Sequence, residues 1–181
     1  MISDVRIFAR LWGLLGIWRW GKAVLDEPPK DVIERRIVQS QVVVNVLFQY
    51  LENCAYLSSK GVLGWNTAKQ NKAWVWSCRF WAAHVGLEFL RLAREYSMRG
   101  EHGTEDEKRM DGPHGAVRTD RAEKEWWAGF KTQLLVNTAW APLTLHWSSE
   151  GGLIGDFWVG LFGSVAGVVG VTNLWRNTDV V

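Results

Sequence analysis

Cysteine is scarce in this sequence. Its 181 residues include two cysteines, Cys54 and Cys78, and neither belongs to a recognisable set of metal ligands. So few thiols argue against a disulfide scaffold and favour a reducing compartment, although a bridge between these two residues stays open. His102 and His114 do not lie at metal-site spacing from a carboxylate either. We therefore predict neither a metal ion nor any other cofactor.

A strong excess of charge of one sign is also lacking. The formal net charge of +2 is too mild to indicate binding to nucleic acid, and no basic patch is interleaved with aromatic residues. The chain has no P-loop and no nucleophile elbow. His84 lies one helical turn before Glu88 and can in principle form an acid–base pair with it, but no nucleophile or metal ligand accompanies them. We predict that the chain is not an enzyme and does not bind nucleic acid.

The amino-terminal segment lacks the pattern of a cleavable signal peptide, because Asp4, Arg6 and Arg10 interrupt its apolar stretch. The mean hydropathy of the chain, −0.10, is far below that of a polytopic transporter. Any helices that contact a membrane are therefore expected to be mostly amphipathic. Thirteen tryptophans favour the same environment, since indole rings concentrate at the membrane–water interface. Tryptophan-rich soluble cores and sugar-binding clefts have a similar composition.

The pattern of apolar residues predicts a single all-α domain over 1–181. Pro28 and Pro29 separate the first helix from the second, and Gly61 ends the second. The segment that follows the third helix is charged and contains glycine and proline, so it cannot bury enough apolar surface to become ordered. The predicted parts are an amphipathic segment at 1–24, two central helices within 30–97, a charged mobile loop at 98–121 and a helical hairpin at 122–176.

The first predicted helix, about 3–20, has an apolar face opposite a basic one. The apolar arc of its helical wheel contains Phe8, Leu11, Trp12, Leu15 and Trp18, and the basic arc contains Arg6 and Arg10. This arrangement is typical of an interfacial helix that lies in the headgroup plane of a membrane with its arginines near phosphates. An amphipathic helix packed on its own domain has the same pattern.

The carboxy-terminal segment is the second candidate for membrane contact. No charged residue occurs between Phe157 and Trp175, and this run is about 28 Å long as a helix, close to the ~30 Å of bilayer hydrocarbon. Small residues recur at helical spacing and permit close helix packing; they are Gly160, Gly163, Ser164, Gly167 and Gly170. Because 133–149 is also uncharged, we predict a glycine-rich transmembrane hairpin. A buried helix of a soluble core, or strands broken by glycines, are the alternatives.

One face of the third predicted helix, about 68–97, carries a polar stripe. Its residues recur at spacings of three, four and seven; they are Ser77, His84, Glu88, Arg91 and Glu95. Glu88 and Glu95 can each form an ion pair with Arg91 along the helix. We interpret the polar stripe as the solvated or headgroup-facing edge of an interfacial helix. The alternative is a polar path inside a membrane bundle.

The sequence LLVNTAWAPLTLHWSSEGGLIGDFWVGLFGSVAGVVGVTNLWR resembles the end of the peroxin-11 family of peroxisomal membrane-elongation proteins. In that family an apolar segment, a polar hinge and a glycine-rich apolar helix follow one another. The residues that carry the likeness here are Gly155, Gly160, Gly163, Gly167, Gly170, Trp175 and Arg176. The segments LLGIWRWGKAV and QYLENCAYLSSKGVLGW resemble the family's arginine- and aromatic-rich stretch and its central helix. The resemblance covers nearly the whole chain.

The resemblance implies a membrane-associated bundle of about five helices in the peroxisomal membrane. Such a protein self-associates, elongates the membrane and promotes peroxisome proliferation and fission with a dynamin-related GTPase and its adaptors. The amino-terminal helix is then expected to wedge into a leaflet that contains anionic lipids, while the small residues of the carboxy-terminal helix pack against another helix. Two alternatives are a small-solute pore lined by the polar stripe, and a non-remodelling adaptor that recruits fission machinery through 98–121.

Overall fold

The described part of the chain folds into six helices. The structure, a computed structural model, describes the backbone at residues 2–106 and 113–178, and every regular element within those ranges is a helix. The helices are α1 (Ile2–Arg10), α2 (Gly13–Asp26), α3 (Val32–Ser59), α4 (Thr67–Asp106), α5 (Pro113–Trp147) and α6 (Asp156–Thr178). The prediction of an all-α fold is confirmed.

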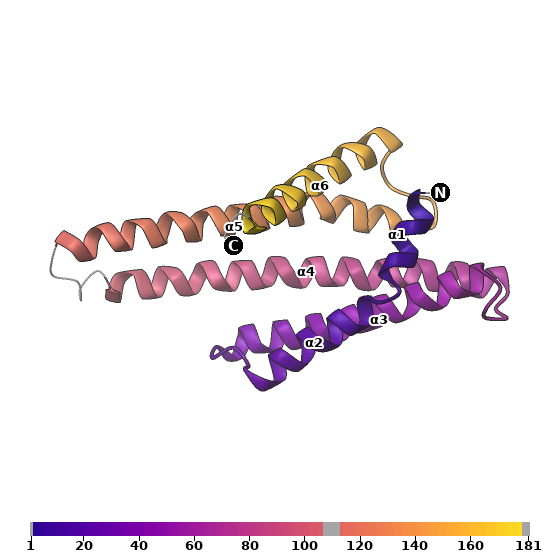
Figure 1. Ribbon diagram of the computed structural model, residues 1–181, viewed down its shortest axis with the longest axis horizontal. Coiled ribbons are helices and arrows are strands. Elements are labelled where there is room, and N and C mark those ends of the chain that lie inside the picture. Colours follow the sequence, from indigo (N-terminus) through magenta and orange to yellow (C-terminus); the bar gives the residue numbers. More distant parts are fainter. Residues whose placement is uncertain (1, 107–112, 179–181) are drawn as a thin grey trace.

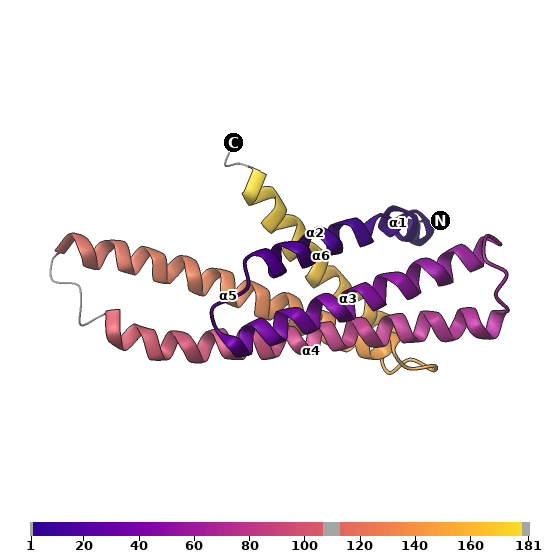
Figure 2. The ribbon, with the colours of Figure 1, turned by 90° about the horizontal axis from the view of Figure 1, so that it is seen from below.

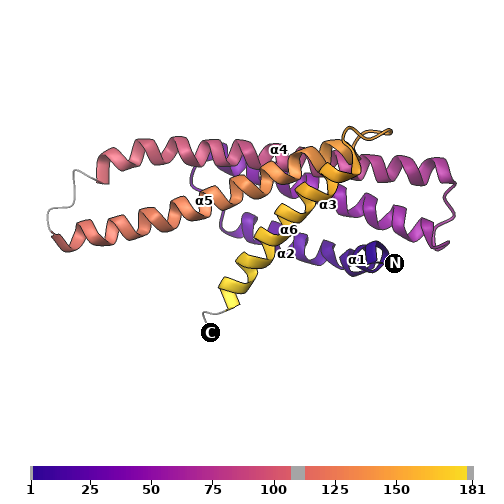
Figure 3. The same ribbon diagram turned by 90° about the horizontal axis from the view of Figure 1, so that it is seen from above.

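The three longest helices, α3, α4 and α5, run antiparallel and form one layer with α4 in the middle (Figure 1). α2 packs on α3, and α6 packs on α5. Seen along the other directions, α1, α2 and the carboxy-terminal half of α6 lie on the same side of α4 (Figures 2 and 3). The molecule therefore has two different faces.

The ends of α3 follow local signals that the sequence contains. The Asp31 carboxylate accepts a hydrogen bond from the Glu34 backbone N–H at 2.8 Å and so caps the first turn. After Ser59 the chain turns at Gly61, whose φ of +76° is a left-handed conformation that favours glycine. Asn66 then caps α4 by accepting a hydrogen bond from the Lys69 N–H at 2.8 Å. These caps place α3 and α4 as an antiparallel pair.

Aromatic rings at the centre of the layer join its three helices. The Trp81 ring of α4 stacks on Phe48 of α3, with ring centroids 5.7 Å apart. On its other side it meets Trp140 and Trp147 of α5 at 4.9 and 5.8 Å. Small and aliphatic side chains complete the core around these rings. Trp81 of α4 thus contacts both α3 and α5.

The predicted first helix is in fact two helices that meet at Leu11 and Trp12. A helix that ends leaves its last carbonyl groups without intrahelical partners. Here α3 supplies those partners: the Gln49 side-chain amide donates to the Arg10 carbonyl at 3.0 Å, and the Asn53 amide donates to the Leu11 carbonyl at 3.1 Å. The break is stabilised by residues almost forty positions away, and the helical wheel of 3–20 contains no sign of it.

The prediction of a charged mobile loop at 98–121 is wrong over most of its length. α4 continues to Asp106, and α5 already begins at Pro113. Glutamate, lysine, arginine and alanine are good helix formers, and proline is well tolerated as the first residue of a helix because its missing N–H has no intrahelical partner there. The part of the predicted loop at 107–112 lies outside the described residues, and so do the side chains of 100–106 and 113–121.

The prediction of a transmembrane carboxy-terminal hairpin also needs correction. α5 and α6 do form a helical hairpin, and α6 crosses α5 obliquely instead of lying along it (Figure 3). In the part of the chain that the structure describes, no helix combines the length and the apolar character needed to cross a membrane. The uncharged runs of α5 and α6 are interrupted by polar and small residues such as Asn137, Thr144 and Asn173, which lower their apolar character.

Candidate functional site

The outward surface of α1 and α2 carries large apolar side chains that are mostly exposed. Trp12 and Trp18 keep 70% and 73% of their surface exposed. We call the following residues the outer face of α1–α2: Phe8, Trp12, Leu15, Trp18 and Leu25. The inward side of α2 is formed by Gly21 and Val24, which are buried. Four of the five predicted apolar membrane-binding residues are therefore free to contact a membrane.

Two basic side chains are interspersed with this apolar surface. Arg19 and Lys22 are exposed, and each follows an apolar residue of the outer face by one helical turn, Leu15 and Trp18 respectively. Long basic side chains can extend from an apolar surface toward phosphate groups while their stems stay in contact with it. The outer face of α1–α2 thus combines apolar and positively charged groups, as interfacial membrane helices do.

The predicted basic arc differs from the structure. The Arg10 guanidinium does not point toward solvent but forms an ion pair with Glu52 of α3 at 2.6 Å. Leu11, predicted in the apolar arc, is only half-exposed. The break between α1 and α2 rotates both residues toward α3, so neither belongs to the outer face. The backbone of Arg6 lies in α1, and its side chain is outside the described part of the structure.

The polar stripe of α4 is not the solvated edge that the sequence suggested. It lies at the interfaces of α4 with α3 and α5. The Gln41 amide donates a hydrogen bond to Glu88 at 2.7 Å, and the Asn45 amide lies 2.9 Å from His84 Nδ1. Near the end of the same interface Arg94 pairs with Asp31 at 2.9 Å. Three polar residues that were not selected from the sequence, Gln41, Asn45 and Asp31, thus each bond to a polar residue of α4.

Arg91 joins the network of α3 and α4 to α5. Its guanidinium contacts Glu88 at 2.6 Å and Glu95 at 3.1 Å, and it also hydrogen-bonds to the side chain of Gln133. Glu95 in turn accepts a hydrogen bond from the Trp126 indole N–H at 2.9 Å. Every charged member of the polar stripe is therefore engaged across a helix interface.

The electrostatics of the network agree with this internal position. Burial lowers the pKa of His84, and the nearby Glu88 carboxylate only partly offsets the effect. Burial raises the pKa of Glu88, but hydrogen bonds from Arg91 and Gln41 outweigh it and keep that pKa below its ordinary value. The hydrogen bond from Arg94 lowers the pKa of Asp31 to about 2. We conclude that near neutral pH His84 is neutral while Glu88 and Asp31 are ionised.

Ser77, the remaining member of the stripe, is buried and donates a hydrogen bond to the Trp74 carbonyl at 2.7 Å. Because Ser77 is buried and its hydroxyl bonds within its own helix, it does not line an open path.

The sequence also predicts that the chain holds no metal ion. Within the described residues, no group of three or more His, Cys, Asp or Glu side chains is placed to hold a metal ion.

The predicted packing face of α6 is open toward the rest of the described structure. Gly160, Ser164, Gly167 and Gly170 are exposed, and Gly163 is half-buried. A Cβ atom added at any of these glycines would meet no other atom within 4 Å, so the open space beside them is not filled by α5. Their use in contacts with another helix stays a prediction.

A separate row of apolar side chains on α6 was missed in the sequence. We call it the apolar stripe of α6; it consists of Phe157, Leu161, Val168, Val171 and Trp175, all exposed. The opposite side of the helix, with Phe162 and buried Ala166, faces α5. The spacing of four, seven, three and four residues places the stripe along one side of the helix. This spacing is present in the sequence but is hidden there because the inward-facing side is also apolar.

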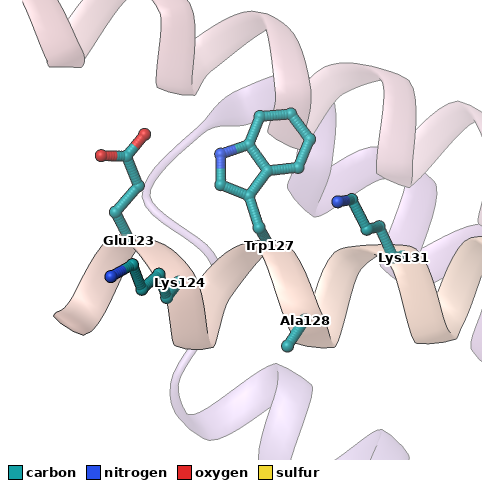
Figure 4. A pocket seen from close by; sticks show the side chains of 5 residues that line it. All are labelled: Glu123, Lys124, Trp127, Ala128 and Lys131. Atoms are coloured by element: carbon teal, nitrogen blue, oxygen red, sulfur yellow. The ribbon is translucent and has the colours of Figure 1, made fainter. Parts of the chain in front are cut away.

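A shallow hollow lies along α5. It is lined by Glu123, Lys124, Trp127, Ala128 and Lys131, and Figure 4 shows Trp127 and Lys131 on the same side of that helix. The Lys131 ammonium lies 5.8 Å from the centre of the Trp127 ring. The lysines and the tryptophan come from a single helix and surround no buried polar group, so we assign no ligand to this hollow.

The fold defines the class as an all-α protein with a polar network between its long helices and apolar helix surfaces left open. Comparison with known proteins adds one relative. The chain is 26% identical over 176 residues to the uncharacterized protein C1F12.04c of Schizosaccharomyces pombe, a match that covers 96% of this chain and 73% of the relative. No model of a known protein family matches the chain. No solved structure matches it either.

Proposed function

We propose that this protein binds the surface of membranes that contain anionic lipids and bends them through the outer face of α1–α2. The observation that carries the proposal is the exposure of Phe8, Trp12, Leu15 and Trp18 on helices whose other side is fixed to α3. Burying one such side chain away from water is favourable by about 1.5–3 kcal/mol. A lipid interface offers this burial to all four at once.

The mechanism follows from the depth at which such a helix lies. An amphipathic helix inserted at the boundary of headgroups and acyl chains occupies area in one leaflet and not in the other. The leaflet with the inserted helix expands relative to the other leaflet, so the membrane becomes convex on the side where the protein is bound. Arg19 and Lys22 contribute attraction to anionic headgroups, worth about 1 kcal/mol for each basic residue near the surface. Because α2 is attached to a long rigid bundle, the inserted helix is held at a fixed orientation.

The resemblance to the peroxin-11 family supports a more specific form of the proposal. In this form the membrane is that of the peroxisome, and the protein elongates it and promotes proliferation and fission. Self-association through the open glycine surface of α6, and recruitment of a dynamin-related GTPase with its adaptors, belong to the same proposal. These parts rest on the likeness of residues, whereas the lipid-binding surface rests on the exposed side chains of α1 and α2.

The test is flotation of the full chain with vesicles of phosphatidylcholine that contain about a third phosphatidylserine. Leu15→Glu combined with Trp18→Glu places two charges on the outer face and should weaken binding by at least about tenfold, since charged groups resist burial. The matched control is Ala83→Glu with Leu90→Glu. Both positions are exposed and lie on α4, which is separated from α2 by α3. The control should bind like the unmodified protein.

The same vesicles report on bending when they are viewed by electron microscopy. The unmodified protein should draw them into tubules, and the Leu15→Glu, Trp18→Glu protein should not. Arg19→Gln with Lys22→Gln should weaken binding to the anionic vesicles and remove most of its dependence on salt. Equal binding by the outer-face variant and the α4 control would refute the proposal.

A further inference from the structure

α6 carries an apolar surface that the proposed function does not yet use. Five exposed apolar residues follow one side of this helix, and no Asp, Glu, Lys or Arg interrupts the helix from Phe157 to Trp175. The opposite side packs on α5 through residues such as Phe162 and Ala166. Exposed surfaces of this kind mark contact sites for another molecule or a membrane.

The position of α6 indicates which of these contacts it makes. The carboxy-terminal half of α6 and the whole of α2 lie on the same side of the layer of long helices (Figures 2 and 3). In the perpendicular view they lie on either side of α4 (Figure 1). The exposed side chains of each helix point away from the long helix on which it packs, α3 or α5. A single surface can therefore touch α2 and the carboxy-terminal half of α6, while the amino-terminal half of α6 slopes away from it (Figure 2).

We infer that the carboxy-terminal half of the apolar stripe of α6, with Val168, Val171 and Trp175, inserts obliquely into the same lipid leaflet as the outer face of α1–α2. This inference rests on the proposed function and extends it to a second element. The aromatic side chain of Trp175, at the carboxy-terminal end of α6, is exposed and suited to the membrane–water interface.

The charges on this side of the molecule favour a lipid surface over a second copy of the chain. A second copy seated on α6 would leave the outer face of α1–α2 uncovered. If the two copies instead met through both surfaces, Arg19 and Lys22 of each would face a partner surface that brings more positive charge. An anionic leaflet complements both surfaces together, since it provides apolar depth and negative headgroups.

The inference has a mechanical consequence for the proposed bending. Two inserted helices on separate positions of one face prevent the protein from tilting about α2. Both then displace lipid in the same leaflet, and their separation determines the direction along which the leaflet expands. The protein is expected to bind more weakly, and to bend vesicles less, when either helix is disabled.

The first test compares matched variants of the full chain on the anionic vesicles used above. Val168→Glu with Val171→Glu should weaken binding about tenfold or more while the protein keeps its helical circular dichroism, because both positions are exposed. The Ala83→Glu, Leu90→Glu control should bind normally. Binding unchanged by the α6 variant would overturn the inference, whereas binding unchanged by the Leu15→Glu, Trp18→Glu variant would overturn the proposed function instead.

The second test measures the depth of α6 directly. An environment-sensitive fluorophore is attached to a single cysteine introduced at Leu161, Val168 or Trp175, with Cys54 and Cys78 replaced by serine. Lipids that carry a quencher should quench the labels at 168 and 175, and should quench the label at 161 less, because the amino-terminal half of α6 slopes away from the leaflet. Quenching at 161 that equals or exceeds quenching at 175 would contradict contact through the carboxy-terminal half. Absence of quenching at all three would contradict lipid contact altogether.

Light scattering tests the remaining alternative, which is that a second copy of the chain covers α6. If the unmodified protein is a dimer in solution, and Val168→Glu with Val171→Glu converts it to a monomer without weakening vesicle binding, α6 contacts a second copy and the inference is wrong. A label at Leu15→Cys serves as the internal reference in every quenching experiment. Quenching at residue 15 but not on α6 leaves the proposed function intact and removes only the inference about α6.

Discussion

At the residue scale, the polar stripe shows how much the meaning of a side chain depends on its neighbours. His84 and Glu88 lie one turn apart and suggest acid–base chemistry or a solvated edge. In the fold each has a partner on α3: Asn45 for His84 and Gln41 for Glu88. Buried polar groups with satisfied hydrogen bonds favour one packing arrangement over others. We therefore regard these residues as the ones that set the register of α3 against α4.

The lowered pKa of His84 predicts a pH dependence of stability. Asn45 and Glu88 are its polar neighbours, and Glu88 is already ionised above its own low pKa. The unfolded chain binds a proton near the ordinary histidine value of 6.5, whereas folded His84 binds it only at a lower pH. This contribution to the free energy of unfolding is therefore complete above pH 6.5 and is lost progressively as the pH falls below it.

His84→Gln retains an amide able to bond with Asn45 but does not titrate. The urea midpoint of the unmodified protein should fall between pH 7 and pH 5, as followed by circular dichroism, and the decline should be smaller in the variant. The two proteins are otherwise identical, so the difference between the two curves isolates residue 84. Parallel curves would show that burial of His84 has no effect on stability.

At the element scale, the join between α1 and α2 is decided by close contact with α3. A Cβ atom at Gly13 would lie 2.6 Å from Gln49 Oε1, whereas one at Gly16 would meet nothing within 4 Å. Gln49 is 3% exposed, and its amide also bonds to the Arg10 carbonyl and to Asn53, so it cannot easily move aside. Glycine is thus needed at residue 13 for space, but not at residue 16.

We predict opposite effects for two alanine substitutions three residues apart. Gly13→Ala should destabilise the protein by about 1–3 kcal/mol through overpacking against Gln49. Gly16→Ala should stabilise it by about 0.5–1 kcal/mol, because alanine is the better helix former and the site is open. Urea unfolding followed by circular dichroism measures both. Equal effects of the two substitutions would mean that α2 does not pack on α3 as described.

At the scale of the whole molecule, the fold is a layer of three long helices held by aromatic and polar contacts at its middle. Trp81 contacts Phe48 on one side and Trp140 and Trp147 on the other. It therefore connects the part that holds α1 and α2 to the part that holds α6. The alignment of the two open apolar surfaces depends on this connection.

Trp81→Ala should lower the free energy of unfolding by about 3 kcal/mol, the low end of the range for removal of a large aromatic side chain, because Trp81 is half-buried. Trp76→Ala on the same helix removes a 41% exposed ring and should cost about 1 kcal/mol or less. Denaturant unfolding of the full chain gives both values. A similar loss from both substitutions would show that the centre of the layer is not where the three helices are joined.

The sequence by itself determined the helical class, the approximate limits of α3 and the presence of apolar faces at both ends of the chain. These features arise from local spacing, from proline and glycine at helix ends and from the absence of charge in α6, all of which can be read without knowledge of neighbours. The sequence also allowed most of the outer face of α1–α2 to be predicted, because Phe8, Trp12, Leu15 and Trp18 repeat at helical intervals.

Only the tertiary structure decided which polar and glycine residues face inward. Arg10 pairs with Glu52, forty-two positions along the chain, and the helix break beside it is stabilised by Gln49 and Asn53. Neither contact leaves a local signal. α6 likewise has apolar residues on both sides, so its sequence does not indicate which side is exposed. Packing on α5 buries one side and leaves the apolar stripe of α6 exposed. A helical wheel gives the spacing of side chains around an axis, but the neighbouring helices determine which direction becomes the interior.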